Sequence, residues 1–272
     1  MPHFTTNDGT QLFYTDEGTG TPVIALAGLT RCGADFDHVA PHMDARLIRL
    51  DYRGRGQSDW ADYTSYSIVQ EATDTIMLMD HLGLAKAAIL GTSRGGLIAM
   101  VLAATAKDRL TGVALNDIGP ELDPAGLDFI KDYIGRNPAQ KTYEDLAAAR
   151  AKFMTGFQDV PMDRWIAEAK AHYTQTDSGL VIRYDPKLRE AVLEAGAQPA
   201  PDLWPLFDAL DGLPLALIRG ANSDLLTKET ADEMARRRPD MIRTDIAGRG
   251  HVPFLDEPEA LDVLGQWLEK LP

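Results

Sequence analysis

The stretch of this sequence best suited to chemistry is Gly91-Thr92-Ser93-Arg94-Gly95-Gly96. The apolar run before it is short enough for a buried strand, and the run over 97–106 has the length and composition of a helix. A serine between a strand and a helix lies on a sharp turn, and Gly91 and Gly95 remove side chains where that turn is crowded. The pattern is typical of a nucleophile elbow, which exposes a serine Oγ above a sheet.

A serine hydroxyl is a weak nucleophile and needs a base that is itself held by a third group. His251, in Gly250-His251-Val252-Pro253, is the candidate base. Asp224 is the candidate carboxylate, with Asp117 as its alternative because Asp117 follows the strand after the elbow helix. Among the other histidines, only His172 is placed where it can face the same site.

Alternating strand and helix signals predict a parallel sheet with helices on both faces. We expect strands over 4–6, 11–15, 23–27, 46–50, 88–90, 110–115, 215–218 and 241–246. The first two flank Asn7-Asp8-Gly9, a hairpin turn signal. Loops that follow parallel strands meet at one edge of the sheet. The residues expected together at that edge are Leu29, Ser93, Asp117, Asp224 and His251.

The strand pattern stops between 118 and 211, where helix signals recur. Two helices, one after 123 and one after 185, each begin with Asp-Pro and end at a Gly. Two further helices are predicted over 142–154 and 162–173. We therefore expect a core domain of residues 1–117 and 212–272. A helical cap of residues 118–211 is expected as an insertion in that core.

Four motifs occur in order along the chain: Asp51-Tyr52-Arg53-Gly54-Arg55-Gly56-Gln57-Ser58-Asp59, then Gly91 to Gly96, then Arg219-Gly220-Ala221-Asn222-Ser223-Asp224, then Gly250 to Pro258. Through them the chain resembles the α/β-hydrolase family over nearly its whole length. The resemblance implies a mostly parallel, eight-stranded, doubly wound sheet with an inserted helical cap. It also implies a triad in the chain order Ser, Asp, His.

The oxyanion of an attacked carbonyl needs two fixed donors, and the first is the backbone N–H of Arg94. The resemblance implies that the N–H of Leu29 is the second. Two departures from the family concern these residues. Relatives usually carry His-Gly before the oxyanion residue, whereas Ala27-Gly28 stands here, and an apolar residue is common at the position of Arg94.

These features predict a serine hydrolase that cleaves a small carboxylic ester or lactone through an acyl-enzyme, with no metal or cofactor. The alternatives within the fold are hydrolysis of carbon–carbon bonds in vinylogous diketones, acyl transfer and a haloperoxidase-like activity. A serine nucleophile argues against haloalkane dehalogenases and epoxide hydrolases, whose relatives use Asp. A non-catalytic ligand-binding protein is disfavoured by the intact set of Ser, Asp and His, and a nucleotide-binding protein by the glycine spacing.

Substrate contacts are expected from the cap and from two arginines near the sheet edge. Arg31 and Arg94 could bind a substrate carboxylate in a bidentate manner, or each could pair with a nearby acid. Aromatic residues of the predicted cap could line an apolar pocket; they include Phe129, Tyr133, Phe153, Phe157, Trp165, Tyr173 and Trp204.

The composition excludes several kinds of partner. A net charge of −14 over 272 residues argues against nucleic acid, whose phosphates need clustered Lys and Arg. Cys32 is the single cysteine, so no intrachain disulfide is possible. The first residues resemble no secretory signal, and no apolar run is long enough to span a membrane. We predict a cytoplasmic monomer or homodimer whose partner is a small-molecule substrate.

Overall fold

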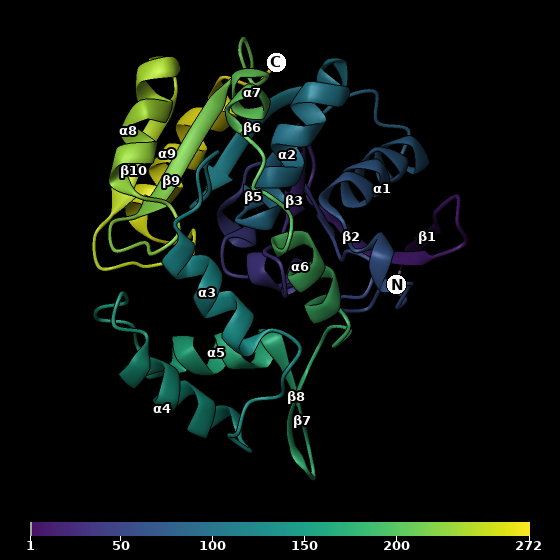
Figure 1. The fold of residues 1–272 in the computed structure, drawn as a ribbon. Helices are drawn as coiled ribbons and strands as arrows, with labels where there is room; N and C mark the ends of the chain where they lie inside the picture. The colour runs from purple at the N-terminus through teal and green to yellow at the C-terminus, as the bar shows by residue number, and fades with distance from the viewer. Residues whose placement is uncertain (1) are drawn as a thin grey trace.

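The computed structural model describes residues 2–272, and a single eight-stranded sheet forms its centre (Figure 1). The strands stand in the order β1-β2-β4-β3-β5-β6-β9-β10. Their bounds are β1 His3–Thr5, β2 Gln11–Glu17, β3 Pro22–Leu26, β4 Arg46–Leu50, β5 Ala87–Thr92, β6 Leu110–Asn116, β9 Leu215–Gly220 and β10 Ile242–Ile246. β2 is antiparallel to both of its neighbours, β1 and β4, and all the other pairs are parallel. The predicted fold class is confirmed.

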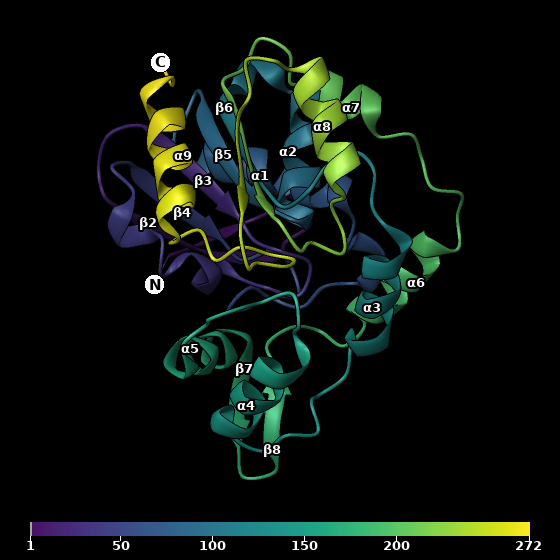
Figure 2. The ribbon, with the colours of Figure 1, turned by 90° about the vertical axis from the view of Figure 1, so that its left-hand side faces the viewer.

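Both faces of the sheet are covered, which explains why its central strands are apolar throughout. In β3, Ile24 and Leu26 pack in the cluster that includes residues of α1, α2, α7 and α8, whereas Val23 and Ala25 pack with α9 on the other face. Figure 2 shows the sheet between these two groups of helices. The helices are α1 Ile68–His81, α2 Arg94–Thr105, α7 Trp204–Asp208, α8 Lys228–Arg237 and α9 Pro258–Glu269. None of the helices in residues 2–272 is long and apolar enough to cross a membrane.

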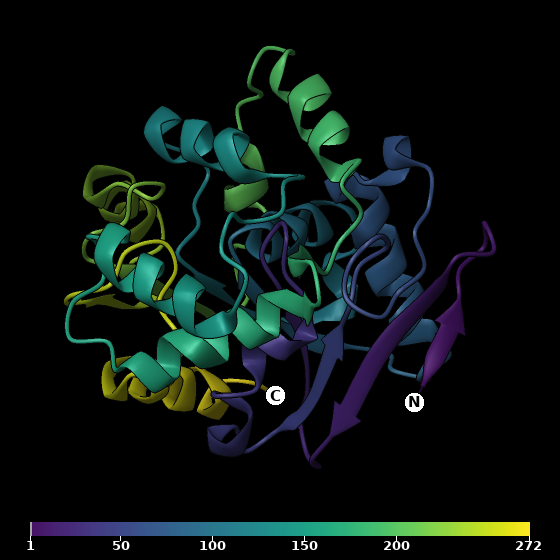
Figure 3. The same cartoon turned by 90° about the horizontal axis from the view of Figure 1, so that it is seen from below.

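The segment between β6 and β9 lies beyond the carboxyl ends of the parallel strands, and Figure 3 shows its teal helices in front of the sheet. It contains α3 Pro124–Tyr133, α4 Tyr143–Phe153, α5 Met162–His172, β7 Tyr173–Thr176, β8 Gly179–Ile182 and α6 Leu188–Gly196. The four predicted helices are present. The antiparallel hairpin of β7 and β8 was not expected, because its strands are short and β7 is mostly exposed.

Backbone hydrogen bonds attach this segment to the core loop that follows β4. The N–H of Gly56 donates to Arg183 O at 2.8 Å, and the N–H of Asp185 donates to Gly54 O at 2.8 Å. At the other end of the segment, α7 packs on α2 and places Phe207 in the main core. We therefore propose that the cap consists of residues 118–203, with α7 belonging to the core.

Candidate active site

Ser93 occupies the turn between β5 and α2, and its backbone is strained. Its φ of 50° and ψ of −114° lie outside the regions that L-residues favour. A Cβ at Gly91 would lie 2.5 Å from the carbonyl carbon of Gly95, and a Cβ at Gly95 would lie 2.0 Å from Leu26 O. Only glycine fits these two positions. The sharp turn expected from the sequence is therefore present, and it leaves Ser93 at the wall of a cavity.

A chain of hydrogen bonds joins three side chains at the edge of the sheet. His251, in the loop after β10, has Nε2 at 3.0 Å from Ser93 Oγ and Nδ1 at 2.7 Å from Asp117 Oδ2. Asp117 follows β6 directly, with φ at 53°, and its side chain is fully buried. Its carboxylate also accepts hydrogen bonds from Gly220 N at 2.7 Å and from Ser223 Oγ at 2.6 Å.

The prediction that Asp224 pairs with His251 is wrong, and the alternative, Asp117, takes that place. Asp224 lies in the turn after β9, where its side chain is exposed and makes no hydrogen bond within residues 2–272. It does line the cavity. The neighbouring Ser223 and Gly220 instead donate to Asp117, so the turn that carries Asp224 serves to hold the other carboxylate.

The two predicted oxyanion donors, the backbone N–H groups of Leu29 and Arg94, donate no hydrogen bond within residues 2–272. Arg94 is the first residue of α2, where a helix leaves its N–H groups unpaired. The loop that carries Leu29 is held by Tyr52, whose hydroxyl donates to Ala27 O at 3.0 Å. Both amides thus remain available to an anionic oxygen.

A single buried carboxylate is linked to both residues that carry these amides, to Arg94 directly and to Leu29 through Arg55. Glu71, on α1, forms ion pairs with Arg94 at 2.5 Å and with Arg55 at 3.0 Å, and its side chain has no exposed surface. Arg55 in turn donates from Nε to Leu29 O at 3.1 Å. The side chain of Arg94 is therefore paired with Glu71 and does not face a substrate. Of the two alternatives that the sequence left open for Arg94, pairing with a nearby acid is the one observed.

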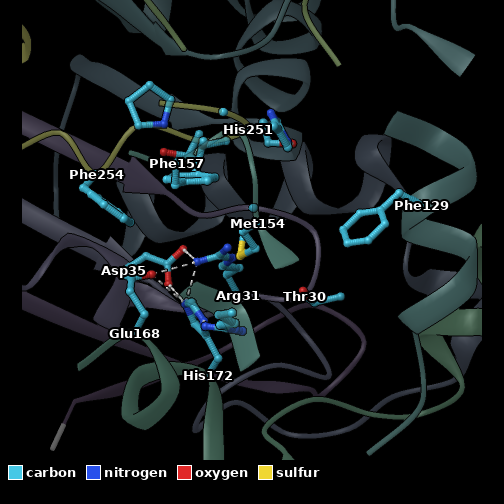
Figure 4. Close-up of a pocket in the computed structure, with 18 of the residues that line it drawn as sticks. Thr30, Arg31, Asp35, Phe129, Met154, Phe157, Glu168, His172, His251 and Phe254 are labelled. Atoms are coloured by element: carbon cyan, nitrogen blue, oxygen red, sulfur yellow. Dashed lines mark hydrogen bonds and ion pairs between the residues drawn. The ribbon is translucent and has the colours of Figure 1, made fainter. Parts of the chain in front are cut away.

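A cavity of about 840 Å³ opens over Ser93 and His251, between the sheet edge and the cap. Four residues predicted to contact substrate line it: Arg31, Phe129, Tyr133 and Trp165. Figure 4 shows how Phe129, Phe157 and Phe254 surround the space beside His251. The fifth, Trp204, lies outside the cavity and its prediction is wrong. Its ring packs against Phe207 and under the guanidinium of Arg237, and its Nε1 donates to Glu121 at 2.8 Å.

A charged group forms the opposite side of the cavity (Figure 4). Arg31 lies 3.5 Å from Asp35 and 3.4 Å from Glu168, and its Nη1 is 2.6 Å from His172 Nε2. Arg150 lies 3.2 Å from the other ring nitrogen of His172. Of these residues, the sequence had indicated Arg31 and His172. For Glu168, the available signal was its helical spacing from His172 on the same cap helix.

His172 is neutral in this setting. Burial, together with the charges of Arg31 and Arg150, holds the pKa of His172 well below its usual value of 6.5. A neutral imidazole has one N–H and one acceptor nitrogen, whereas Nε2 lies 2.8 Å from Asp35 Oδ1 and 2.6 Å from Arg31 Nη1, and Nδ1 lies 3.2 Å from Arg150 Nη1. The ring can therefore accept a hydrogen bond from only one of the two arginines. One of the two arginine N–H groups beside the ring thus finds no acceptor on His172.

Comparison with known proteins agrees with this architecture. Residues 21–258 match the alpha/beta hydrolase fold family, so the chain belongs to that family and is a hydrolase. No group of three or more His, Cys, Asp or Glu in residues 2–272 is arranged to hold a metal ion.

Two relatives and one solved structure are similar over most of the chain. The chain is 34% identical to a 3-hydroxybutyrate-oligomer hydrolase of Cupriavidus necator, with 90% of this chain and 87% of the relative covered. It is 26% identical to a 2-(acetamidomethylene)succinate hydrolase of Mesorhizobium japonicum, with 90% and 86% covered. The crystal structure of an alpha/beta hydrolase from Novosphingobium aromaticivorans superposes with a TM-score of 0.93 at 36% identity, and covers 99% of this chain and 98% of that one.

Proposed function

We propose that this protein is a serine hydrolase that cleaves a carboxylic ester through an acyl-enzyme. The observation that supports this most is the continuous hydrogen-bond chain from Asp117 through His251 to Ser93 Oγ. The chain ends at a strained turn that lines the cavity. This arrangement is the one that activates a serine for attack on a carbonyl carbon.

In the first half-reaction, Ser93 Oγ attacks the ester carbonyl carbon while its proton passes to His251 Nε2. The carbonyl oxygen becomes an oxyanion, which the backbone N–H groups of Leu29 and Arg94 stabilise. When the tetrahedral intermediate collapses, the carbon–oxygen bond of the ester breaks, and the departing alkoxide takes the proton from His251. The acid part of the substrate stays on Ser93 as an acyl ester.

In the second half-reaction, His251 takes a proton from water, and the resulting hydroxide attacks the acyl carbon. Collapse of this second intermediate releases the acid, and His251 returns its proton to Ser93 Oγ. Asp117 stabilises the imidazolium in both halves, and it keeps the proton of the resting imidazole on Nδ1. Nε2 is thus left free to accept the serine proton.

The cavity and the relatives support a proposal for the substrate class. An oligomer of 3-hydroxybutyrate is joined by ester bonds, and the relative from Cupriavidus necator is named for hydrolysing one. The cavity combines aromatic walls near His251 with charged residues on the opposite side. This combination suits a short ester that carries both an apolar and a polar end. We therefore propose a small ester of a hydroxy acid as the substrate.

A fluorophosphonate probe and a substrate panel test this proposal. We expect the probe to label the wild type and the control Ser178→Ala, which changes an exposed serine in the turn after β7, but not Ser93→Ala. We also expect 4-nitrophenyl acetate and the linear dimer of 3-hydroxybutyrate to be hydrolysed. No labelling of the wild type, or turnover of vinylogous 1,5-diketones with none of the esters, would show that the proposal is wrong.

A further inference from the structure

The charged side of the cavity contains more cationic donors than its own acids use. Arg31 approaches Asp35 and Glu168 only at 3.5 and 3.4 Å, whereas charge-assisted hydrogen bonds are usually about 2.7–2.9 Å. Its Nε and Nη2 make no hydrogen bond within residues 2–272, although both remain accessible. A guanidinium has five N–H donors in a rigid fork, so most of those on Arg31 are unused.

Arg150 lacks a carboxylate partner altogether. Its guanidinium contacts His172 Nδ1 at 3.2 Å and lies 5.5 Å from the ring centre of Tyr173, and no carboxylate of residues 2–272 approaches it within 4.0 Å. Burial lowers the pKa of Arg150, which means that the site disfavours an uncompensated cation. An anion entering the cavity would supply the missing counter-charge.

The charged side of the cavity, with Arg31, lies close to the nucleophile Ser93. A Cβ placed on Gly28 would lie 3.5 Å from Arg31 Cγ and 3.9 Å from Ser93 Cβ. The aliphatic part of the Arg31 side chain and the side chain of Ser93 are therefore both adjacent to Gly28. Figure 4 shows the guanidinium of Arg31 between His251 on one side and Asp35, Glu168 and His172 on the other. When the ester carbonyl of a substrate lies at Ser93, a substituent only a few bonds from that carbonyl can reach Arg31.

We propose that Arg31 and Arg150 form a carboxylate subsite, which selects esters that carry a free carboxylate a few bonds from the scissile carbonyl. This inference rests on the proposed function and narrows its substrate to acyloxy acids. His172 lies between the two arginines, with Nε2 at 2.6 Å from Arg31 Nη1 and Nδ1 at 3.2 Å from Arg150 Nη1, and it can accept a hydrogen bond from only one of them. Asp35 and Glu168 keep Arg31 in place without saturating it.

A matched pair of substrates tests the subsite. 3-Acetoxybutyrate and 3-acetoxybutanamide share the same scissile acetyl ester and differ in charge but hardly in size. We expect the wild type to prefer the acid in kcat/KM by at least about tenfold, the factor that one charge-assisted hydrogen bond provides. Arg150→Gln should remove most of this preference, chiefly through KM for the acid, so that kcat/KM falls much more for the acid than for the amide. The control Arg136→Gln, an exposed cap arginine outside the cavity, should keep the preference.

Equal turnover of acid and amide by the wild type would overturn the subsite and leave the esterase proposal standing. An equal loss on both substrates in Arg150→Gln would also overturn it. Binding to the Ser93→Ala variant separates the subsite from the chemistry, because it needs no hydrolysis. We expect calorimetry to show binding of 3-acetoxybutyrate but not of the amide, with the binding lost in Ser93→Ala/Arg150→Gln. Selective binding without any turnover by the wild type would refute the hydrolysis proposal and retain the subsite.

Discussion

Asp117 and Asp224 follow neighbouring strands of the sheet. Replacing each of them in turn with asparagine tests which carboxylate acts on His251. Asp117→Asn keeps the size of the side chain, and the amide can still accept from Gly220 N and offer an N–H to Ser223 Oγ. The amide N–H that faces His251 would, however, require Nδ1 to be the acceptor. The imidazole proton would then lie on Nε2, which could no longer accept the proton of Ser93.

The expected loss in kcat is about 10⁴-fold, which is typical when the aspartate of such a triad becomes asparagine. Stability should change far less. The variant exchanges hydrogen bonds to a charged acceptor for neutral ones, which costs about 1–2 kcal/mol of unfolding free energy. Asp224→Asn changes an exposed side chain that makes no hydrogen bond in the part of the chain that the structure describes. Because Asp224 makes no hydrogen bond to His251, its replacement should lower kcat far less than Asp117→Asn does.

The assay is steady-state hydrolysis of 4-nitrophenyl acetate, with thermal unfolding of each variant to confirm the fold. The fluorophosphonate labelling rate gives a second measure of serine activation that does not depend on product release. If Asp117→Asn kept a tenth or more of the wild-type kcat, or if Asp224→Asn lost as much as Asp117→Asn, the assignment of Asp117 would be refuted.

Two further predictions concern buried charges. Glu71→Gln leaves two arginines facing each other, so it should lower the unfolding free energy by about 3–5 kcal/mol, and the double variant Glu71→Gln/Arg94→Leu should recover part of that loss in urea titrations. An unchanged unfolding midpoint in Glu71→Gln would contradict this. His172 has its pKa lowered in the folded state, so below pH 6.5 the unfolded chain binds a proton that the folded chain does not. The wild type should therefore lose about 1.4 kcal/mol more than His172→Gln between pH 7.5 and pH 5.5, and equal losses would show that His172 does not titrate in this way.

The parts of the fold that the sequence predicted well are those with an unambiguous pattern. Residues 23–27 are apolar at every position because helices cover both faces of the sheet, and that run can hardly be anything but a central strand. Ser93 was found because glycines stand where a side chain would collide. The β7–β8 hairpin was missed because four-residue strands, one of them largely polar, have too little periodicity to distinguish them from a loop.

The errors at the site have a common physical origin. Asp117 and Asp224 both follow strands that end at the same sheet edge, and sequence position does not show which carboxylate points inward. The direction is set by the positive φ of Asp117 and by the donors of the β9 turn. Trp204 was misplaced for a similar reason. An aromatic side chain on a short amphipathic helix has the same pattern whether it packs on the core or lines a cavity.

The ion pairs around Glu71 also bear on how this sequence can diverge. Arg55, Glu71 and Arg94 carry a net positive charge together, so an apolar residue at 94 would leave a balanced pair of Arg55 and Glu71. Loss of Glu71 first would leave two buried cations without their shared counterion. Descendants of this sequence can therefore acquire the apolar elbow residue common in relatives by changing 94 before 71, but not in the reverse order. Homologues that lack an acid at 71 are accordingly expected to lack an arginine at 55 or 94.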